Sequence, residues 1–367
     1  MKILFVATLS ITINSFFKPH IEMLVHGGNQ VDIACNYEEV PLDGRYEELG
    51  CKIYQVGLSR APLSKENYKA VSQLKSIVKS GRYDIIHCHT PNASVLTRMI
   101  CRKLRKNGTR VFYTAHGFHF YKGAPKKNWL LFYPIEKLCA RFTDKLITIN
   151  NEDYQLAKKK LKAKEVCYVP GVGVDLSRFG TASVDKKAKR QQLGIPEDAR
   201  LLFSVGELND NKNHKLVIEA LARLEGTDIH YVVAGKGYKH DSLCELAVRL
   251  GVSDRVHFLG YRNDVAELYS AADIFCFPSI REGLSVALME AMASKLPVIC
   301  SNIRGNVDLI NDSPSCLFDP YSVESCMSAI EKVMTADLAA LGEKNRERVS
   351  QFSIQNVLKI MTDIYSE

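Results

Sequence analysis

Two glutamates in residues 281–292 (REGLSVALMEAM) have types and a spacing that could bind a ligand. Glu290 lies within an apolar run that has the pattern of a helix, and a helix that is apolar nearly all round is usually buried. A buried carboxylate is costly unless something compensates its charge. Glu290 and the earlier Glu282 therefore need a ligand, or else a salt bridge to Arg281 or Lys295.

The start of the same helix could bind an anion. Strand 274–277 precedes it, and its unpaired backbone N–H groups and dipole suit a diphosphate. The residues expected to form the helix start are Gly283, Leu284 and Ser285. Glu290 would lie roughly 9 Å further along the axis. Because a nucleotide-sugar has its diphosphate between sugar and ribose, Glu282 could bind sugar hydroxyls and Glu290 ribose hydroxyls.

Three other segments of the second half could contact the same ligand. In 204–214 (SVGELNDNKNH) a strand stops at Gly206, and Lys212 near the next helix start would be a point charge for phosphate, or an ordinary surface lysine. Arg304 follows strand 298–300 and could reach an anion, or could be an exposed loop arginine. The side chains beyond strand 255–258 that could pack on a nucleobase are Tyr261 and Arg262.

The first half carries histidines just after two strand ends. His87, His89, His116 and His119 raise the possibility of zinc, but no acidic ligand lies near them in the sequence. A hydrogen-bonding role facing a ligand is the better interpretation, with His116 as the first candidate. His119 could equally pack inside.

A segment rich in lysine and aromatic residues follows at 120–142 (FYKGAPKKNWLLFYPIEKLCARF). Lys122, Lys126, Lys127 and Trp129 suit an anionic membrane interface or the acceptor side of a site. The alternative is an amphipathic helix with its apolar face in the core, and the two are compatible.

Charge is distributed unevenly over the 367 residues. Residues 1–180 hold 28 Lys and Arg against 15 Asp and Glu, and residues 181–367 hold 21 against 26. A basic half indicates an anionic partner such as nucleic acid, an acidic substrate or a membrane surface. No RNA-binding aromatic motif accompanies it, so we expect no nucleic acid. The stretch 186–190 is typical of a solvated helix face.

The expected elements alternate between short apolar strands and amphipathic helices, which predicts parallel sheets with helices on both faces. We expect an α/β fold with two doubly wound domains facing across a cleft, spanning 1–170 and 171–349. A helix within 350–367 would cross back to the first domain. The apolar run that follows Met1-Lys2 is too short for a signal peptide and is expected to be a first strand. No apolar run is long enough to span a membrane.

The sequence contains no GxxxxGK[ST] loop and no GxGxxG after the first strand. It also has no Asp-x-Asp pair, which argues against a metal-dependent nucleotide-sugar site. The eleven cysteines show no CxxC spacing and are expected to be reduced core residues. We therefore expect neither a metal nor a cofactor.

These motifs resemble family 4 retaining glycosyltransferases of GT-B fold, in the bacterial capsule and exopolysaccharide branch. The resemblance rests on the two-glutamate spacing with Gly283-Leu284, on YVPGVGVDLSRF between the domains and on VGELNDNKNH. It implies that Glu290 binds ribose and that Glu282 lies near the transferred sugar, beside amides of 283–285. It further implies that Lys212 binds diphosphate and that His116 faces the donor sugar.

Two departures from the family pattern stand out. Glu207 occupies the usual place of an arginine, and Arg304 is our hypothesis for its replacement. The glycine-rich loop after the first strand is absent, so contacts there would come from residues 8–14.

The resemblance implies a glycosyltransferase with Lys212, Glu282 and His116 as catalytic residues. It would move a hexose or N-acetylhexosamine from a nucleotide-diphosphate sugar, such as a UDP-sugar, to a polyprenyl-diphosphate-linked or growing glycan. We expect a cytoplasmic protein, peripheral on the inner face of the cytoplasmic membrane. A nucleotide-sugar 2-epimerase of the same fold is the alternative, and a non-enzymatic nucleic-acid or membrane-binding protein is a third.

Overall fold

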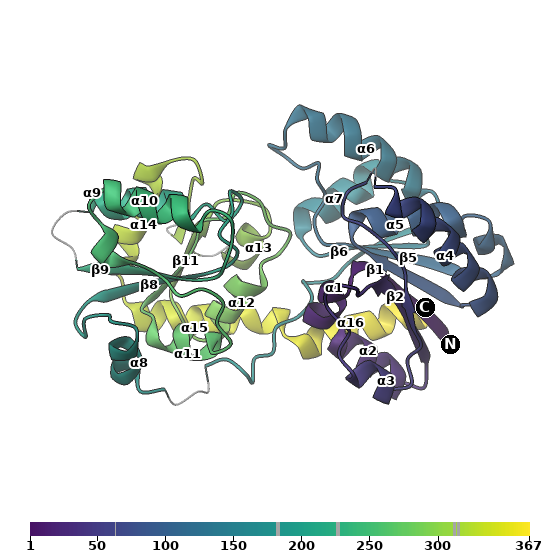
Figure 1. The fold of residues 1–367 in the computed structure, drawn as a ribbon, viewed down its shortest axis with the longest axis horizontal. Helices are drawn as coiled ribbons and strands as arrows, with labels where there is room; N and C mark the ends of the chain where they lie inside the picture. Colours follow the sequence, from purple (N-terminus) through teal and green to yellow (C-terminus); the bar gives the residue numbers. More distant parts are fainter. Residues whose placement is uncertain (63, 181–183, 225–227, 311–312, 314–315) are drawn as a thin grey trace. The chain divides into compact units, whose positions relative to one another are not determined.

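The computed structural model describes residues 1–62, 64–180, 184–224, 228–310, 313 and 316–367. The chain divides into two compact units, which we call unit 1 (1–172 with 355–367) and unit 2 (173–354). Each unit has one sheet of parallel strands covered by helices on both faces (Figure 1). The predicted α/β, Rossmann-like fold class is confirmed.

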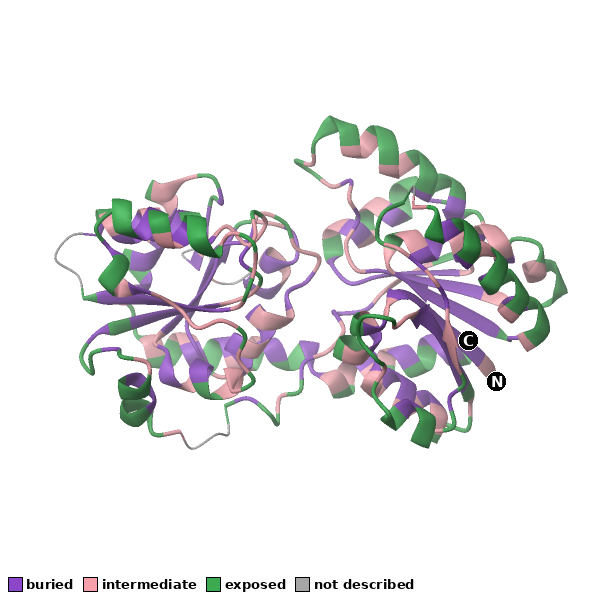
Figure 2. Cartoon of the chain, in the orientation of Figure 1, coloured by how far each residue is buried: buried purple, intermediate pink, exposed green. Residues whose placement is uncertain are grey.

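The sheet of unit 1 has the strand order β3-β2-β1-β4-β5-β6-β7. Its strands are β1 (Lys2–Leu9), β2 (Gln30–Asn36), β3 (Ile53–Gln55), β4 (Ile85–His89), β5 (Arg110–Ala115), β6 (Lys145–Thr148) and β7 (Glu165–Tyr168). The central strands are continuous apolar runs because both faces are covered, as Figure 2 shows by their burial. The order reverses between β1 and β4, which makes the carboxyl ends of these two strands a topological switch point.

Helices cover both faces of this sheet. They are α1 (Ser10–Phe16), α2 (Lys18–His26), α3 (Arg45–Glu48), α4 (Glu66–Gly81), α5 (Pro91–Cys101), α6 (Lys126–Ala140), α7 (Asn151–Lys160) and α16 (Ile354–Ser366), with a 3-10 turn η1 (Leu104–Asn107). Helix α16 returns from the end of the chain: the Lys145 Nζ donates to the Ile364 carbonyl at 3.0 Å. The prediction that the last helix crosses back to the first half is confirmed.

The sheet of unit 2 has the order β10-β9-β8-β11-β12-β13, with its switch point between β8 and β11. Its strands are β8 (Arg200–Val205), β9 (Ile229–Ala234), β10 (Val256–Phe258), β11 (Ile274–Phe277), β12 (Val298–Ser301) and β13 (Leu317–Phe318). Its helices are α8 (Lys186–Gln192), α9 (His214–Arg223), α10 (His240–Arg249), α11 (Val265–Ala271), α12 (Val286–Ala293), α13 (Asn306–Ile310), α14 (Val323–Met334) and α15 (Leu338–Val349), with 3-10 turns η2 (Ser253–Arg255) and η4 (Ser350–Phe352).

The expectation of a solvated face at 186–190 is wrong for two of its residues. Lys189 and Arg190 are buried in α8. Lys189 pairs with Asp264 and Glu267 at 2.6 Å each, and Arg190 pairs with Asp273 at 2.6 Å. These carboxylates are distant in the sequence, so local composition gave no sign of them. All eleven cysteines are free thiols, and all but Cys167 and Cys244 are buried, which agrees with the expectation that they are mostly core residues.

Candidate active site

The switch point of unit 2 brings two predicted site residues together. Strands β8 and β11 are neighbours in register, with Phe203 opposite Phe275. The loop after β8 carries Lys212, and the loop after β11 carries Glu282. In open α/β sheets, ligands bind beyond the carboxyl ends of the strands at such a point.

Lys212 and Glu282 form an ion pair there. The Lys212 Nζ donates to the Glu282 Oε1 at 2.8 Å, and both side chains are about four-fifths buried, with 21% and 18% exposed. The Lys212 ammonium also lies 4.7 Å from the centroid of the Phe277 ring. Gly206 lies under the Lys212 side chain, since a Cβ atom at Gly206 would approach the Lys212 Cε to 3.1 Å.

Hydrogen bonds hold the two loops together. The Ile280 backbone N–H donates to the Asn211 carbonyl at 2.8 Å, and the Asn211 Nδ2 donates to the Arg281 carbonyl at 3.0 Å. The Asn209 side chain accepts from the Lys212 backbone N–H at 2.9 Å. The position of the lysine is therefore set by backbone contacts as well as by its ion pair.

The helix after Glu282 begins later than expected. Helix α12 starts at Val286, and Ser285 is its N-cap, because the Ser285 Oγ accepts from the Leu288 backbone N–H at 3.2 Å. Gly283 and Leu284 lie in the preceding loop. Within the described residues, no acceptor takes the backbone N–H groups of 283–287. The potential anion site is thus a loop and a helix start together.

Arg304 lies against this loop. Its Nε donates to the Glu282 carbonyl at 3.2 Å, and the residue is only 6% exposed. Gly305 has φ of +79°, and a Cβ atom there would overlap the Gly283 carbonyl. Only glycine therefore fits, and it keeps Arg304 beside the Glu282 loop. Glu207, in the place of the family arginine, instead accepts from the Asn209 Nδ2 at 3.0 Å.

Glu290 is the second carboxylate of the site, four residues into α12. The Tyr269 hydroxyl lies 3.2 Å from its Oε2, and burial raises the pKa of Glu290 to about 6 even though the Tyr269 bond and the charge of Arg178 act to lower it. Neither basic residue considered as its alternative partner pairs with it within the described chain, and Lys295 pairs with Glu343. The carboxylate thus remains available as a hydrogen-bond acceptor.

Tyr261 and Arg262 lie after β10, away from the switch point in the strand order. The Tyr261 side chain is 71% exposed. Arg262 forms a two-pronged pair with Asp264, and that hydrogen bond raises the pKa of the Arg262 guanidinium. The structure does not record a contact between these two residues and the Lys212–Glu282 pair.

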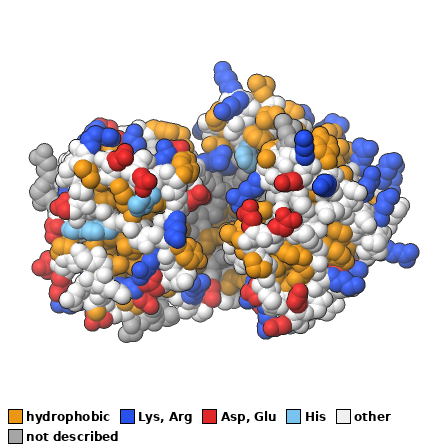
Figure 3. Space-filling view, in the orientation of Figure 1, with side chains coloured by type: hydrophobic (Ala, Val, Ile, Leu, Met, Phe, Trp, Pro, Cys, Tyr) orange, Lys and Arg blue, Asp and Glu red, His pale blue; other side chains and the backbone are white. Residues whose placement is uncertain are grey.

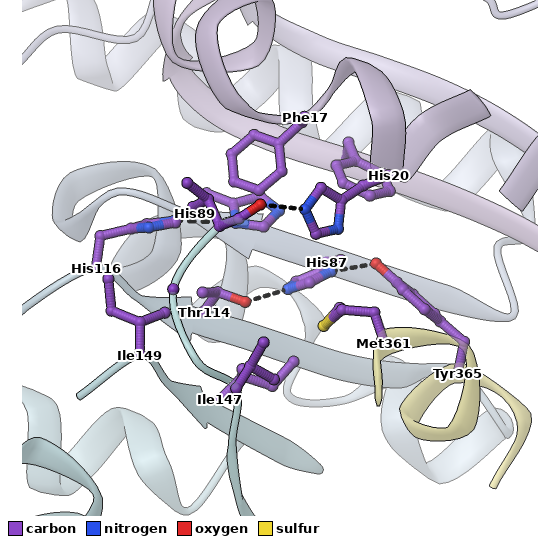
Figure 4. A pocket seen from close by; sticks show the side chains of 14 residues that line it. Phe17, His20, His87, His89, Thr114, His116, Ile147, Ile149, Met361 and Tyr365 are labelled. Carbon is purple, nitrogen blue, oxygen red and sulfur yellow. Dashed lines mark hydrogen bonds between the residues drawn. The ribbon is translucent and has the colours of Figure 1, made fainter. Parts of the chain in front are cut away.

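Four histidines of unit 1, His20, His87, His89 and His116, line a cavity of about 10 Å³ (Figure 4). The His116 Nε2 lies 3.4 Å from the His89 Nδ1, and His87 bonds Thr114 at 2.8 Å and the Tyr365 hydroxyl. Burial lowers the pKa of His116 to about 4. His119 instead packs on the Phe132 ring, 4.7 Å between centroids. In the described part of the chain, no three or more His, Cys, Asp or Glu side chains are arranged so that they could hold a metal ion.

The basic segment forms the start of α6. Lys122, Lys126 and Lys127 are exposed, whereas Trp129 is half-buried against Phe120 and Tyr133. Figure 3 shows Lys and Arg side chains beside hydrophobic ones in the part of unit 1 where Figure 1 draws α6. None of the helices that the structure describes is long and apolar enough to cross a membrane.

Sequence reasoning missed the groups that position the site. Tyr269 reaches Glu290 from α11, and Asn209 and Asn211 hold the Lys212 loop. The two asparagines lie in the segment 204–214, which the sequence analysis names. Because asparagine side chains often hydrogen-bond the backbone of turns, their role in holding this loop could have been predicted. The role of Tyr269 could not, because its partner is 21 residues away in the chain.

Comparison with known proteins agrees with this fold. The family model for glycosyl transferases group 1 matches residues 185–354, and the glycosyl transferase 4-like model matches residues 2–150. The putative glycosyltransferase EpsD of Bacillus subtilis is 36% identical over 374 residues, covering 100% of this chain and 96% of EpsD. The Escherichia coli UDP-Gal:alpha-D-GlcNAc-diphosphoundecaprenol alpha-1,3-galactosyltransferase is 27% identical, with 94% and 90% covered.

Solved structures share the fold. Sucrose-phosphate synthase of Thermosynechococcus elongatus superposes with a TM-score of 0.82 at 20% identity, covering 100% of this chain and 98% of that one. Anabaena HepE in complex with UDP-glucose gives 0.81 at 19% identity, with both chains fully covered.

The chain therefore belongs to the family 4 glycosyltransferases of GT-B fold, as its motifs predicted, and it is a glycosyltransferase. The similarity to EpsD fits the capsule and exopolysaccharide branch. The epimerase alternative gains no support from these relatives.

Proposed function

We propose that this protein is a retaining, metal-independent transferase that moves a hexose or N-acetylhexosamine from a UDP-sugar to a lipid-linked glycan. The observation that carries the proposal is the Lys212–Glu282 pair at the switch point, next to the backbone N–H groups of 283–287. The names of two similar proteins support the donor, since one is a UDP-Gal transferase and the other binds UDP-glucose.

In this proposal the diphosphate of the donor binds between Lys212 and the start of α12. An ammonium has three N–H donors, and Lys212 gives one to Glu282, so others can reach phosphate oxygens. Arg304 adds positive charge from the opposite loop. Fixed donors of this kind stabilise the negative charge that develops on the departing UDP, which is the main catalytic effect we assign to the protein.

The two glutamates bind hydroxyl groups on either side of the diphosphate. Glu290 accepts from the ribose, and Glu282 keeps its second oxygen for the transferred sugar while Lys212 holds the first. Tyr261 and Arg262 contact the base. His116 of unit 1 faces the donor sugar as a neutral hydrogen-bonding group, in line with its lowered pKa.

The acceptor is a polyprenyl-diphosphate-linked saccharide in capsule or exopolysaccharide synthesis. The printed name of the E. coli relative, a diphosphoundecaprenol galactosyltransferase, supports a lipid-linked acceptor. Lys122, Lys126, Lys127 and the region of Trp129 form the membrane and acceptor side, and the protein works peripherally on the inner face of the cytoplasmic membrane.

A thermal-shift panel of UDP-, GDP- and ADP-sugars tests the donor. The matching donor stabilises the folded protein by mass action, so Tm rises with its concentration. Lys212→Ala should abolish the rise, whereas Lys215→Ala, three residues along and 65% exposed, should keep it. No rise with any nucleotide-sugar, or an equal rise in both variants, would contradict the proposed site.

A further inference from the structure

Unit 1 contains a second, larger cavity that the donor site does not use. Its volume is about 500 Å³. Helix α5 forms one wall with Val95 and Leu96, and α6 forms another with Leu131, Phe132 and Ile135. Its lining is mostly apolar, so water inside it is poorly held and an apolar ligand would gain from replacing that water.

The polar side chains that line this cavity already have protein partners. The Asn67 Nδ2 donates to the Ala61 carbonyl at 2.8 Å, and the Asn92 Nδ2 donates to the Ser59 carbonyl at 3.1 Å. Glu136 is paired with Arg98, which is fully buried. A saccharide needs hydrogen-bond partners that these groups no longer offer, whereas a hydrocarbon chain needs none.

The mouth of the cavity continues onto an exposed stripe of α6. Lys127, Leu131 and Ile135 follow each other at intervals of four residues and so lie on one face of the helix. Leu131 and Ile135 line the cavity yet are 59% and 41% exposed. Lys127 is exposed one turn before Leu131, with Lys126 beside it. The stripe therefore joins an apolar opening to positive charge.

We propose that this cavity binds the isoprenoid chain of the lipid-linked acceptor, with Lys127 and Lys126 meeting its diphosphate. The inference rests on the proposed function and adds to it the place where the lipid part of the acceptor is held. A cationic end next to an apolar cavity matches a ligand that has a diphosphate at one end of a hydrocarbon chain.

Trp129, the only tryptophan of the chain, can report on the cavity through a neighbouring ring. Its ring lies 5.5 Å from that of Phe120, which lines the cavity. Titration with farnesyl diphosphate should change its fluorescence saturably, and inorganic diphosphate should not. Leu131→Glu should weaken farnesyl diphosphate binding about tenfold or more, because the bound chain would cover the Leu131 side chain and a carboxylate there would have to lose its water.

Two matched controls separate the cavity from the rest of α6. Leu138 is 45% exposed on the same helix but does not line the cavity, so Leu138→Glu should bind farnesyl diphosphate as the wild type does. Lys127→Ala should weaken binding of farnesyl diphosphate, because its diphosphate loses a positive partner. Lys137→Ala, at the other end of α6, should not weaken it.

Three results would overturn the inference: an equal response to inorganic diphosphate, equal binding by Leu131→Glu and wild type, or binding to phosphatidylglycerol vesicles without any response to farnesyl diphosphate. The last would make the α6 surface a membrane contact only. The rise in Tm with UDP-sugar is measured in parallel. Its absence from the wild type would refute the proposed function, whereas its presence without farnesyl diphosphate binding would refute only this inference.

Discussion

The two units have the same kind of switch point, but an ion pair lies at the one in unit 2 and a pair of hydroxyl groups at the one in unit 1. In unit 2 the loops after β8 and β11 bring the charges of Lys212 and Glu282 together at 2.8 Å. In unit 1 the corresponding strands are β1 and β4, and there the hydroxyls of Thr8 and Thr90 are 2.7 Å apart. On β4, burial lowers the pKa of His87 and of His89 well below the ordinary value.

The difference shows that the sheet fixes where a site can lie and that the loops decide what it holds. Burial lowers the pKa of His20 to about 4 in unit 1, where the imidazole bonds the Val172 carbonyl at 3.2 Å. In unit 2, by contrast, Lys212 and Glu282 form an ion pair whose side chains are partly exposed. The loops of unit 2 thus present an ion pair, whereas the buried histidines of unit 1 offer neutral hydrogen-bonding groups.

The largest expected effect is on the charged switch point. Lys212→Ala should lower kcat about 100- to 1000-fold, because it removes the fixed positive charge that is proposed to stabilise the departing diphosphate. UDP release from the donor, in the presence of acceptor, measures it. Lys215→Ala is the control. If Lys212→Ala retained near-normal kcat, charge at this switch point would not distinguish the two units.

The neutral switch point should respond to pH instead. His20 has a folded pKa of about 4, below its ordinary 6.5, so the unfolded chain takes up the proton first as pH falls. Stability present above pH 6.5 is then lost as pH falls from 6.5 towards 4, by about 3 kcal/mol for this group.

His20→Gln should flatten that loss, because glutamine does not titrate but can still donate to the Val172 carbonyl. Urea denaturation at pH 7 and pH 4.5, followed by Trp129 fluorescence, reports on unit 1. His26→Gln, at an exposed position of the same helix, should keep the wild-type slope. Equal slopes in all three proteins would mean that His20 is not held neutral.

What the sequence could and could not predict has a physical reason. The fold and the two loops that meet at the switch point of unit 2 were predictable, because alternating apolar strands and short motifs such as the Lys212 loop are local patterns. The partners of buried charges were not: Lys189, expected in solvent, is buried against Asp264, 75 residues away. The cavity under α6 was equally invisible, since only the fold brings α5 and the exposed Leu131 together.

A smaller effect is expected at Glu290. This carboxyl group belongs to unit 2, but burial shifts its pKa as it shifts those of the histidines in unit 1. Glu290→Gln should weaken UDP-sugar binding about tenfold, because a charge-assisted hydrogen bond to the ribose becomes a neutral one. In the wild type, donor affinity should fall as pH is lowered through about 6, the pKa of this carboxyl. The variant should show no such dependence. Calorimetric titration at pH 7.5 and 5.5 tests both statements.

The stability of Glu290→Gln serves as the control for that titration. Burial raises the pKa of Glu290 from its ordinary 4.5, so the folded protein holds this proton more tightly than the unfolded chain. The carboxylate therefore costs stability as pH rises from 4.5 through 6. Replacing it should leave the Tm at pH 7.5 unchanged or higher. A lower Tm would assign the binding loss to unfolding and not to the ribose contact.

The smallest expected effect is that of a chelator, which should leave the transfer rate unchanged. In the proposed site, Lys212, Arg304 and backbone N–H groups of unit 2 would supply the positive charge for the diphosphate, so a divalent cation would have no charge left to balance. The rate is measured with EDTA and again after adding Mn²⁺ or Mg²⁺. Loss of activity that Mn²⁺ restores would show that these groups are not enough to balance the charge of the diphosphate. Glu282 would then be the first candidate for a cation ligand, because Mg²⁺ and Mn²⁺ prefer carboxylate oxygens.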